Sequence, residues 1–556
     1  MTASPFLAFL PEIVLLSGAL VLFGICLGES SARQARVAAL AVSLAATAAC
    51  GFCLGQQAVL FEGAYHVDPF SQLLKLVFAG SFVFILLLAG ELGDIRPEVK
   101  PEYYLFLTLS VCGLTLLVSC VDIITLVIAL ELSSFPLYLM VAMRREREGQ
   151  RTQMESAIKY IMFGVAANGI MLFGLSYLFG LTGTTSLPVL VGRLQPLLGS
   201  PLAIIGLAMT CCGLFYKLAV FPFHFWTPDV YQGASNETTS LIASLPKVGA
   251  VAVLVRFVSL VSPGSQSMVL LLTILAAASM FYGNLIALVQ SDLKRLLAFS
   301  GIAHAGYALI GFVTLDQAGY AAALYYIVGY LFMVLACFVV ICKVSRDGVN
   351  ASIEELAGLH RRAPLLAFTL IAGIFALAGI PPFVGFMGKL TLLSVALAQG
   401  HLVLVVVAVV NSAIAIYYYL GIVREACFRE ADEQPPIPLD WPTRALCLLL
   451  VAGILLLGVA PARILDRLSS SLVCVNAFPP NTTSAFTIGG PSVRPAAVEP
   501  DRRRRAAAPT PGPASRGRAA AGKTLAHSSD TNAPNNMNLL FLPGRVIPTG
   551  QSTVTR

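Results

Sequence analysis

Long apolar runs follow one another along most of the chain, and short polar segments separate them. A helix needs roughly 20 apolar residues to cross the hydrocarbon core of a bilayer. Fourteen segments meet that length, two of them interrupted. They are 7–28, 36–56, 72–90, 103–120, 122–142, 155–180, 201–231, 238–260, 266–288, 295–314, 318–343, 364–399, 402–422 and 443–466. The pattern therefore predicts an all-α polytopic membrane protein with about 14 transmembrane helices.

The two interrupted spans are the seventh, which breaks at Pro222, and the twelfth, which breaks at Pro381 and Pro382. They are five helices apart, so they must cross the membrane in opposite directions. Proline removes a backbone hydrogen bond and frees a carbonyl, which is tolerated at membrane depth only where protein or a polar cavity surrounds it. Paired broken helices of opposite direction indicate an inverted repeat with its working site near the midplane. A simple packing kink is the alternative for either break.

The composition agrees with a membrane protein, since 57% of the residues are hydrophobic and 12% are charged, against roughly 25% charged in soluble domains. The first apolar run is long enough to span and lacks a small-residue cleavage site, so no cleavable signal is evident. The formal net charge is +7, and the segment 476–556, with ten basic and three acidic residues, accounts for all of it. We interpret 476–556 as a disordered basic tail, so the charge gives no indication of nucleic-acid binding.

Basic residues concentrate in the odd-numbered loops, and Arg193 is the clear exception. The positive-inside rule then places the odd loops in the cytoplasm, or its organellar equivalent, and both termini on the outer side. The odd loops hold Arg33, Arg36, Arg96, Lys100, Arg144, Arg145, Arg147, Arg151, Lys294, Arg361, Arg362, Arg424 and Arg429.

Several ionisable residues lie inside the predicted spans, where a charge costs about 2.5–3.5 kcal/mol on insertion scales and is therefore a functional candidate. They are Glu131 in the fifth span, Lys159 in the sixth, Lys217 in the seventh, Lys247 in the eighth, His304 in the tenth and Lys389 in the twelfth, with His224 beside the first break. We interpret Lys75, Lys294 and Arg256 as interfacial charges. Lysines outnumber acids, whereas a cation site needs several oxygen ligands.

This set of residues is suited to a proton relay. In general, burial disfavours the charged form of a lysine and a nearby carboxylate favours it, so a lysine whose acidic partner is neutralised or moved can bind and release a proton. We expect Glu131 to be the partner of Lys217, with the proton passing next to Lys247, then to His304 and Lys389. Alternatives stay open: a structural ion pair for Lys217 and Glu131, snorkelling for Lys159, and simple hydrogen bonds for the histidines.

The sequence shows no redox machinery. It has no glycine-rich dinucleotide loop after a strand, no cluster-binding cysteine spacing and no paired haem-type histidines. If the chain moves protons, the free energy must come from an ion gradient or a partner protein.

Six motifs resemble subunit N of bacterial respiratory complex I and its mitochondrial and plastid counterparts. The resemblance covers about residues 5–470. The motifs are ALELSSFPLYLMVA around Glu131, AIKYIMFG around Lys159, FYKLAVFPFHFWTPDVYQGA around Lys217, SLPKVGA around Lys247, LKRLLAFSGIAHAGY around His304 and LAGIPPFVGFMGK ending at Lys389. Within that family, a lysine at 389 argues against the M-type subunit, and the tail lacks the lateral helix of the L-type.

The resemblance implies a proton-translocating, antiporter-like subunit in which Glu131, Lys217, Lys247 and Lys389 carry the proton. It divides the chain into helices 1–3 (1–102), a first five-helix bundle (103–260), an inverted second bundle (266–422), a last helix (443–470) and the tail. It also implies no cofactor in this chain: NADH, FMN, iron–sulfur clusters and quinone would belong to partner subunits. The neighbours would be K-, M- and L-type subunits in a bacterial inner membrane, or in an organellar inner membrane.

Two other functions remain open at the level of sequence. A subunit of a multi-subunit Na⁺/H⁺ antiporter or a membrane-bound hydrogenase would share the fold and the lysines. A non-conducting membrane scaffold would tolerate replacement of the buried lysines.

Overall fold

The computed structural model describes residues 5–28, 31–90, 92–146, 152–258, 265–345, 348–430 and 435–476. The predicted tail, from residue 477 on, lies outside these ranges. The helices are α1 (Pro5–Ala8), α2 (Leu10–Leu27), α3 (Ala32–Phe52), α4 (Pro69–Ala89), α5 (Lys100–Leu117), α6 (Ile123–Ala142), α7 (Thr152–Thr182), α8 (Leu187–Leu194), α9 (Pro201–Leu218), α10 (Trp226–Gly233), α11 (Asn236–Val258), α12 (Gln266–Ala287), α13 (Leu293–Val313), α14 (Gln317–Val344), α15 (Leu359–Arg362), α16 (Pro364–Ala378), α17 (Val384–Ala398), α18 (Leu402–Phe428), α19 (Trp441–Val459) and α20 (Pro461–Asn476). Strands β1 (Ala58–Leu60) and β2 (Tyr65–Val67) pair antiparallel, and 3₁₀ turns lie at Phe61–Gly63, Pro97–Val99, Gln195–Leu197 and Glu354–Leu356.

The prediction of an all-α polytopic membrane protein is confirmed. Among the described residues, twelve helices are long and apolar enough to cross a membrane, and α16 and α17 are shorter apolar helices. The predicted spans correspond in order to α2, α3, α4, α5, α6, α7, α9 with α10, α11, α12, α13, α14, α16 with α17, α18 and α19.

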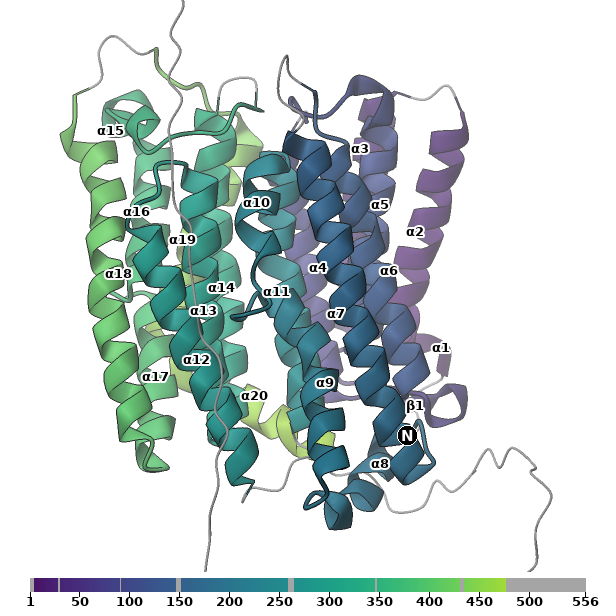
Figure 1. Ribbon diagram of the computed structural model, residues 1–556. Helices are drawn as coiled ribbons and strands as arrows, with labels where there is room; N and C mark the ends of the chain where they lie inside the picture. The colour runs from purple at the N-terminus through teal and green to yellow at the C-terminus, as the bar shows by residue number, and fades with distance from the viewer. Residues whose placement is uncertain are drawn as a thin grey trace, which may run out of the picture. The chain divides into compact units, whose positions relative to one another are not determined.

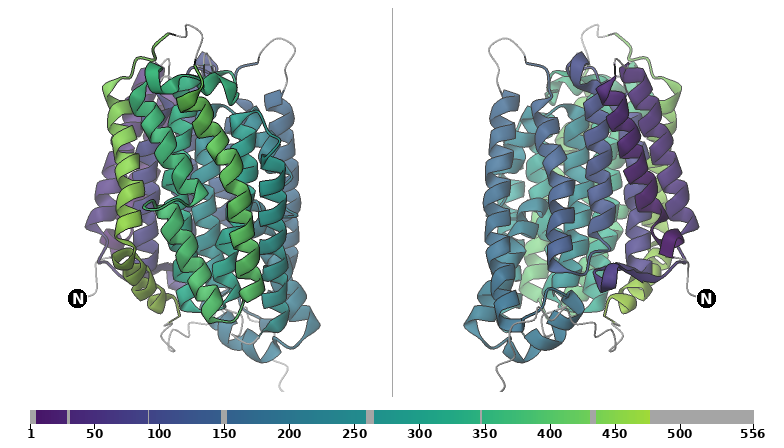
Figure 2. Two further views of the ribbon diagram at one scale, coloured as in Figure 1. Left: turned by 90° about the vertical axis from the view of Figure 1, so that its left-hand side faces the viewer. Right: turned by 90° about the vertical axis from the view of Figure 1, so that its right-hand side faces the viewer.

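The spanning helices stand side by side, with α2 at one edge of the bundle and α18 at the opposite edge (Figures 1 and 2). Helices α11 and α13 are buried over the whole of their membrane windows, whereas α2, α3 and α18 bury a third of theirs. The two fully buried helices therefore form the middle of the bundle, and the others present apolar faces to lipid.

The first break separates α9 from α10. Helix α9 ends at Leu218 because Ala219 adopts the left-handed conformation (φ 64°) and turns its N–H back to the carbonyls of Phe215 and Tyr216. Pro222 follows in a cis peptide bond, and α10 begins at Trp226.

The second break repeats this construction. Helix α16 ends at Ala378, Gly379 is left-handed (φ 87°), its N–H returns to Phe375 and Ala376, and Pro382 follows in a cis peptide bond. Figure 1 shows α9 below α10 but α16 above α17, so the two broken helices run in opposite directions. The predicted inverted pair of breaks is confirmed.

The last span ends earlier than predicted. We expected a helix over 443–466, but α19 ends at Val459 and a separate helix, α20, begins at Pro461. Proline lacks the N–H that would continue α19, and it is well suited to the first position of a new helix. Helix α20 packs against α14 and α4.

Candidate functional site

Lys217 lies in the last turn of α9, next to the first break, and its side chain is buried. Its Nζ donates hydrogen bonds to the Leu130 carbonyl oxygen (3.1 Å), to Ser133 Oγ (3.0 Å) and to Ser134 Oγ (2.6 Å). All three acceptors belong to α6, which begins after Asp122 because that carboxylate accepts from the amides of its first turn. The ammonium group is therefore held by neutral oxygens.

Glu131, which we expected to be the acidic partner of Lys217, follows Leu130 on α6. Its carboxylate accepts a hydrogen bond from Asn168 of α7. Within the described residues no ion pair joins Glu131 to Lys217, although Lys217 is within electrostatic range of that carboxylate. One residue along a helix turns the side chain by about 100°, so Glu131 faces α7 while the 130 carbonyl faces Lys217.

Lys389 occupies the equivalent place at the second break. It is buried in α17, and its Nζ donates to the carbonyl oxygens of Leu377 (3.2 Å) and Ala378 (3.1 Å) at the end of α16. The ammonium also lies 4.8 Å from the centre of the Tyr307 ring. The carbonyls that the break leaves without helical partners thus become lysine acceptors.

Lys247 and His304 lie between the two breaks, on the fully buried helices α11 and α13. Lys247 Nζ donates to the Gly301 carbonyl oxygen (3.1 Å) and lies 5.0 Å from the Tyr330 ring. A Cβ at position 301 would be 2.6 Å from that Nζ, so glycine makes the approach possible. His304 stands one turn further along α13 and contacts the hydroxyl of Tyr326 through Nδ1 (2.6 Å).

The other ring nitrogen of His304, Nε2, lies 3.0 Å from Tyr419 Oη on α18, and Tyr419 also contacts Ser300. Two aromatic rings connect His304 to its lysine neighbours. The His304 ring is 5.0 Å from Tyr330, beneath Lys247, and 6.1 Å from Tyr307, beneath Lys389. The structure thus brings Lys247, His304 and Lys389 together around shared tyrosines.

One property is common to Lys217, Lys247 and Lys389. Among the described residues, none of the three forms an ion pair; their partners are carbonyl oxygens, hydroxyls and aromatic faces. A lysine held this way can release its proton without leaving a buried carboxylate unpaired. The arrangement is suited to reversible protonation.

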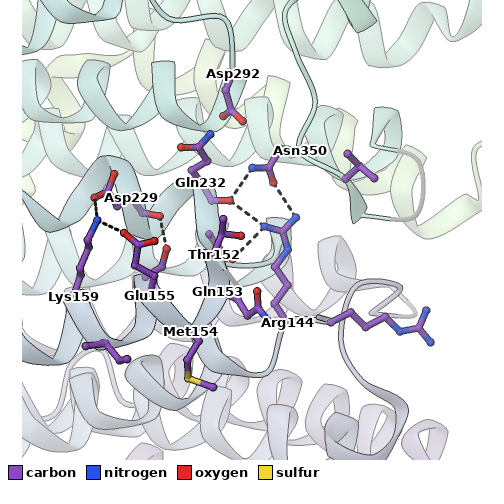
Figure 3. Close-up of a pocket in the computed structure, with 15 residues that line it drawn as sticks. Arg144, Thr152, Gln153, Met154, Glu155, Lys159, Asp229, Gln232, Asp292 and Asn350 are labelled. Carbon is purple, nitrogen blue, oxygen red and sulfur yellow. Dashed lines mark hydrogen bonds and ion pairs between the residues drawn. The ribbon is translucent and has the colours of Figure 1, made fainter. Parts of the chain in front are cut away.

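Lys159 lies apart from this line. Its side chain is 37% exposed, and its Nζ forms ion pairs with Asp229 (2.7 Å) and Glu155 (2.6 Å). Arg295 binds the other oxygen of Asp229 at 2.9 Å. Lys159, Glu155 and Asp229 border a cleft of about 1020 Å³ at the end of the bundle formed by the odd-numbered loops, which Figure 3 shows. Lys159 therefore lies at the odd-loop end of the bundle, apart from the buried lysines.

His224 is buried in the segment between α9 and α10. Its ring stacks on Phe221 (5.3 Å between centres) and contacts Tyr282 (4.2 Å). In the part of the chain that the structure describes, neither ring nitrogen has a hydrogen-bond partner. It does not hydrogen-bond across the break.

Two buried pairs and one buried arginine were not predicted from the sequence. Glu12 and Lys75 form a fully buried ion pair at 2.7 Å between α2 and α4, so Lys75 is not interfacial. Glu237 and Lys294 are buried where α11 and α13 begin. Arg144 uses all five N–H donors, and its acceptors come from three segments. The acceptors are Asp94 Oδ2, the carbonyl oxygens of Gln232, Gly233 and Gly348, and Asn350 Oδ1.

A sequence signal existed for the first of these pairs, because Glu12 is an acid inside the predicted span 7–28. The described residues contain no group of three metal-ligating side chains that could hold an ion.

Comparison with known proteins gives consistent likenesses. Residues 120–415 match the family described as NADH:quinone oxidoreductase/Mrp antiporter, transmembrane. The chain is 66% identical over 472 residues to NADH-quinone oxidoreductase subunit N 2 of Opitutus terrae (85% of this chain, 98% of the relative) and 44% identical over 461 residues to the protein of the same name in Solidesulfovibrio magneticus (83% and 97%). A chain of respiratory complex I from Thermus thermophilus superposes with a TM-score of 0.71 at 30% identity (82% and 98%). A chain of the Mrp complex from Dietzia shares the fold, with a TM-score of 0.76 at 20% identity (86% and 99%).

Proposed function

Since this chain belongs to the subunit N family of NADH-quinone oxidoreductase, we propose that Glu131, Lys217, Lys247, His304 and Lys389 carry its protons across the membrane. Members of the family are proton-translocating membrane subunits of respiratory complex I, and this chain is one of them. It contributes to a translocase whose redox reaction takes place in the assembled enzyme. What we propose is the identity of the side chains that carry the protons in this chain.

The observation that carries the proposal is the chemistry around the three lysines. Two of them stand at breaks that run in opposite directions, and each ammonium binds carbonyls that a helix end or a proline-containing helix provides. Binding to neutral acceptors allows both protonation states to be satisfied, because an amine nitrogen can accept from a hydroxyl once its proton has left. This is the property that a relay needs and that a structural ion pair lacks.

The proposed order follows the elements. A proton held by Lys217, under the influence of Glu131, passes to Lys247 on the neighbouring α11, since α9 and α11 are packed together. Among the described residues no hydrogen bond joins Lys217 to Lys247, so this step goes through water. From Lys247 the proton reaches His304 and then Lys389, because each lysine shares a tyrosine with the imidazole.

The surroundings of the chain are part of the proposal. The free energy comes from electron transfer from NADH to quinone in partner subunits, which would hold the FMN and the iron–sulfur clusters. The neighbours are membrane-arm subunits of the K, M and L types. The membrane would be a bacterial inner membrane, or an organellar inner membrane, and the positive-inside rule places both termini on its outer side, which is the periplasmic side in a bacterium. The antiporter alternative is less well supported, because identity to subunit N chains far exceeds identity to the Mrp chain.

The test is NADH-driven proton pumping by the assembled complex in membrane vesicles, with electron transfer measured alongside. Lys217→Ala and Glu131→Gln should lose pumping, with turnover slowed or uncoupled, while the complex still assembles. Lys343→Met is the matched control, since Lys343 is a partly exposed lysine at the end of α14 that pairs with Asp440. Normal pumping and turnover in both relay variants would leave the scaffold as the better account.

A further inference from the structure

Helix α11 carries a continuous polar face that leads to Lys247. Glu237, Ser240, Ser244 and Lys247 are spaced at i, i+3, i+7 and i+10, which places them on one side of a helix. Ten residues span about 15 Å, so the face reaches from the odd-loop end of the bundle to the level of Lys247. Because α11 is buried throughout its membrane window, this face lies inside protein.

Glu237 is the unusual member of this face. It is buried in the first turn of α11, and its Oε2 has no hydrogen-bond partner within the described residues. The titratable groups near it are Asp94 from the segment before α5, Tyr103 and Tyr104 from α5, Lys294 from α13 and Cys342 from α14. Lys294 is fully buried too, but its Nζ donates to the Ala234 carbonyl oxygen at 2.7 Å rather than to a carboxylate. The carboxyl interacts with Ser235 and with its own backbone N–H, but a buried carboxylate oxygen without a hydrogen-bond partner is costly.

The serines can connect Glu237 to Lys247. Ser240 Oγ donates to the Glu237 carbonyl oxygen (2.7 Å), and Ser244 Oγ donates to the Ser240 carbonyl oxygen (2.6 Å). Each hydroxyl therefore keeps lone pairs that can accept a hydrogen bond from the side of the face. Neighbouring hydroxyls are about one helical turn apart, a gap that one bridging water can span.

The upper end of the face lies close in the chain to residues that line the cleft. Gly233, which lines the cleft, precedes Glu237 by four residues. Ala234, the next residue, accepts a hydrogen bond from Lys294, and Arg295, which follows Lys294, binds the cleft residue Asp229. Glu237 is therefore about one helical turn from the cleft lining, on the side that leads to Lys247.

We propose that Glu237 is a proton-uptake group of this subunit, taking protons at the cleft and delivering them along Ser240 and Ser244 to Lys247, where this route joins the one from Lys217. The proposal rests on the proposed function, since it needs Lys247 as a proton carrier. The Glu237 carboxylate gains a proton from water at the cleft and passes it on through the hydroxyls and their waters. The neutral Lys247 amine gains it as ammonium, so one proton moves and only O–H and N–H bonds change.

The test compares variants of the assembled complex in vesicles at different pH values on the odd-loop side. Glu237→Gln should reduce proton pumping and coupled turnover about tenfold at pH 8, a modest effect for a lost proton-transfer group. The defect should shrink at pH 6, where protons are abundant, and should not respond to pH on the opposite side. Glu237→Asp should restore part of the rate.

A double variant, Ser240→Ala with Ser244→Ala, removes both hydroxyls and leaves the Glu237 carboxyl unchanged. Alanine favours helix, so this variant tests the route even if the Glu237→Gln complex fails to assemble. It should show the same slowed pumping. Ser81→Ala is the matched control, because Ser81 is a buried helical serine of α4 that binds its own helix, at the Val77 carbonyl. The control should pump normally.

The outcomes separate this proposal from the one on which it rests. If Lys217→Ala loses pumping while Glu237→Gln and the double serine variant pump normally at every pH, the relay stands and the uptake route is wrong. A Glu237→Gln defect that is independent of pH would show a structural role and would also overturn it. If the Lys217, Glu131 and Glu237 variants all pump normally, the relay itself fails.

Discussion

Replacing Lys75 by methionine should open the N-terminal helices locally. Lys75 and Glu12 pair at 2.7 Å with both side chains completely buried, and Tyr65 donates to the same Glu12 oxygen at 2.8 Å. Removing one partner of such a pair leaves a buried charge without compensation, which costs about 3–5 kcal/mol. Removing both charges, with Glu12→Gln and Lys75→Met together, should cost far less, because no charge is left to bury.

The assay is thiol labelling of Cys50 in the assembled complex. Cys50 is completely buried and close enough to feel the charges of both Glu12 and Lys75, so labelling it requires these helices to open. A loss of 3–5 kcal/mol corresponds to a rise in the open fraction of about 10²- to 4 × 10³-fold, at about 1.4 kcal/mol for each factor of ten. Peptide mapping would separate Cys50 from the other cysteines.

Two results would refute this reasoning. In the first, Cys50 is labelled as slowly in the Lys75→Met variant as in the parent chain, which would mean that the Glu12–Lys75 pair contributes nothing to local stability. In the second, Cys50 is labelled as fast in the double variant as in Lys75→Met, which would attribute the loss of stability to lost packing rather than to an unpaired charge.

Two further predictions concern the breaks and the Arg144 contacts. Gly379→Ala should destabilise the complex by about 1–2 kcal/mol, the cost of a side chain in the left-handed conformation, and should disturb Lys389, whose Cδ would lie 3.1 Å from the new Cβ. The control, Ala219→Gly, should cause no loss of stability, because Ala219 already carries that strain. Equal thermal denaturation midpoints for Gly379→Ala and the parent complex would contradict the argument. Arg144→Lys should lose at least two of the five hydrogen bonds, at a cost of about 1.5–3 kcal/mol for each bond to a charged group. Proteolysis of the odd-loop segments should therefore become faster. An unchanged cleavage rate would show that these segments stay folded without Arg144.

The sequence was most informative where a single residue decides the structure. Pro222, Pro381 and Pro382 cannot continue a helix, so the two breaks and their opposite directions followed from position alone. A lysine deep in an apolar run can likewise be predicted to be buried, and Lys217, Lys247 and Lys389 are all buried. In these cases the physical constraint is local, and no knowledge of neighbouring helices is needed.

Partner choice could not be predicted in the same way. We expected Glu131 to be the acidic partner of Lys217, whereas the Lys217 ammonium binds the neighbouring carbonyl and two serine hydroxyls. Which groups of α6 face Lys217 depends on how that helix is rotated, which helix order does not specify. Lys75 seemed interfacial because its partner, Glu12, is 63 positions away in sequence. The shared tyrosines around His304 come from α13, α14 and α18, so they emerge only once these helices are packed.

The Arg144 contacts also constrain how the protein is made. The two Nη2 acceptors, Gly348 and Asn350, are more than 200 residues beyond Arg144 in the chain. A ribosome adds residues in order, so a nascent chain that has not yet reached position 348 holds Arg144 with two of its five donors unmatched by their final acceptors. The odd-loop end of the molecule is therefore completed late in synthesis, after the eleventh span has entered the membrane.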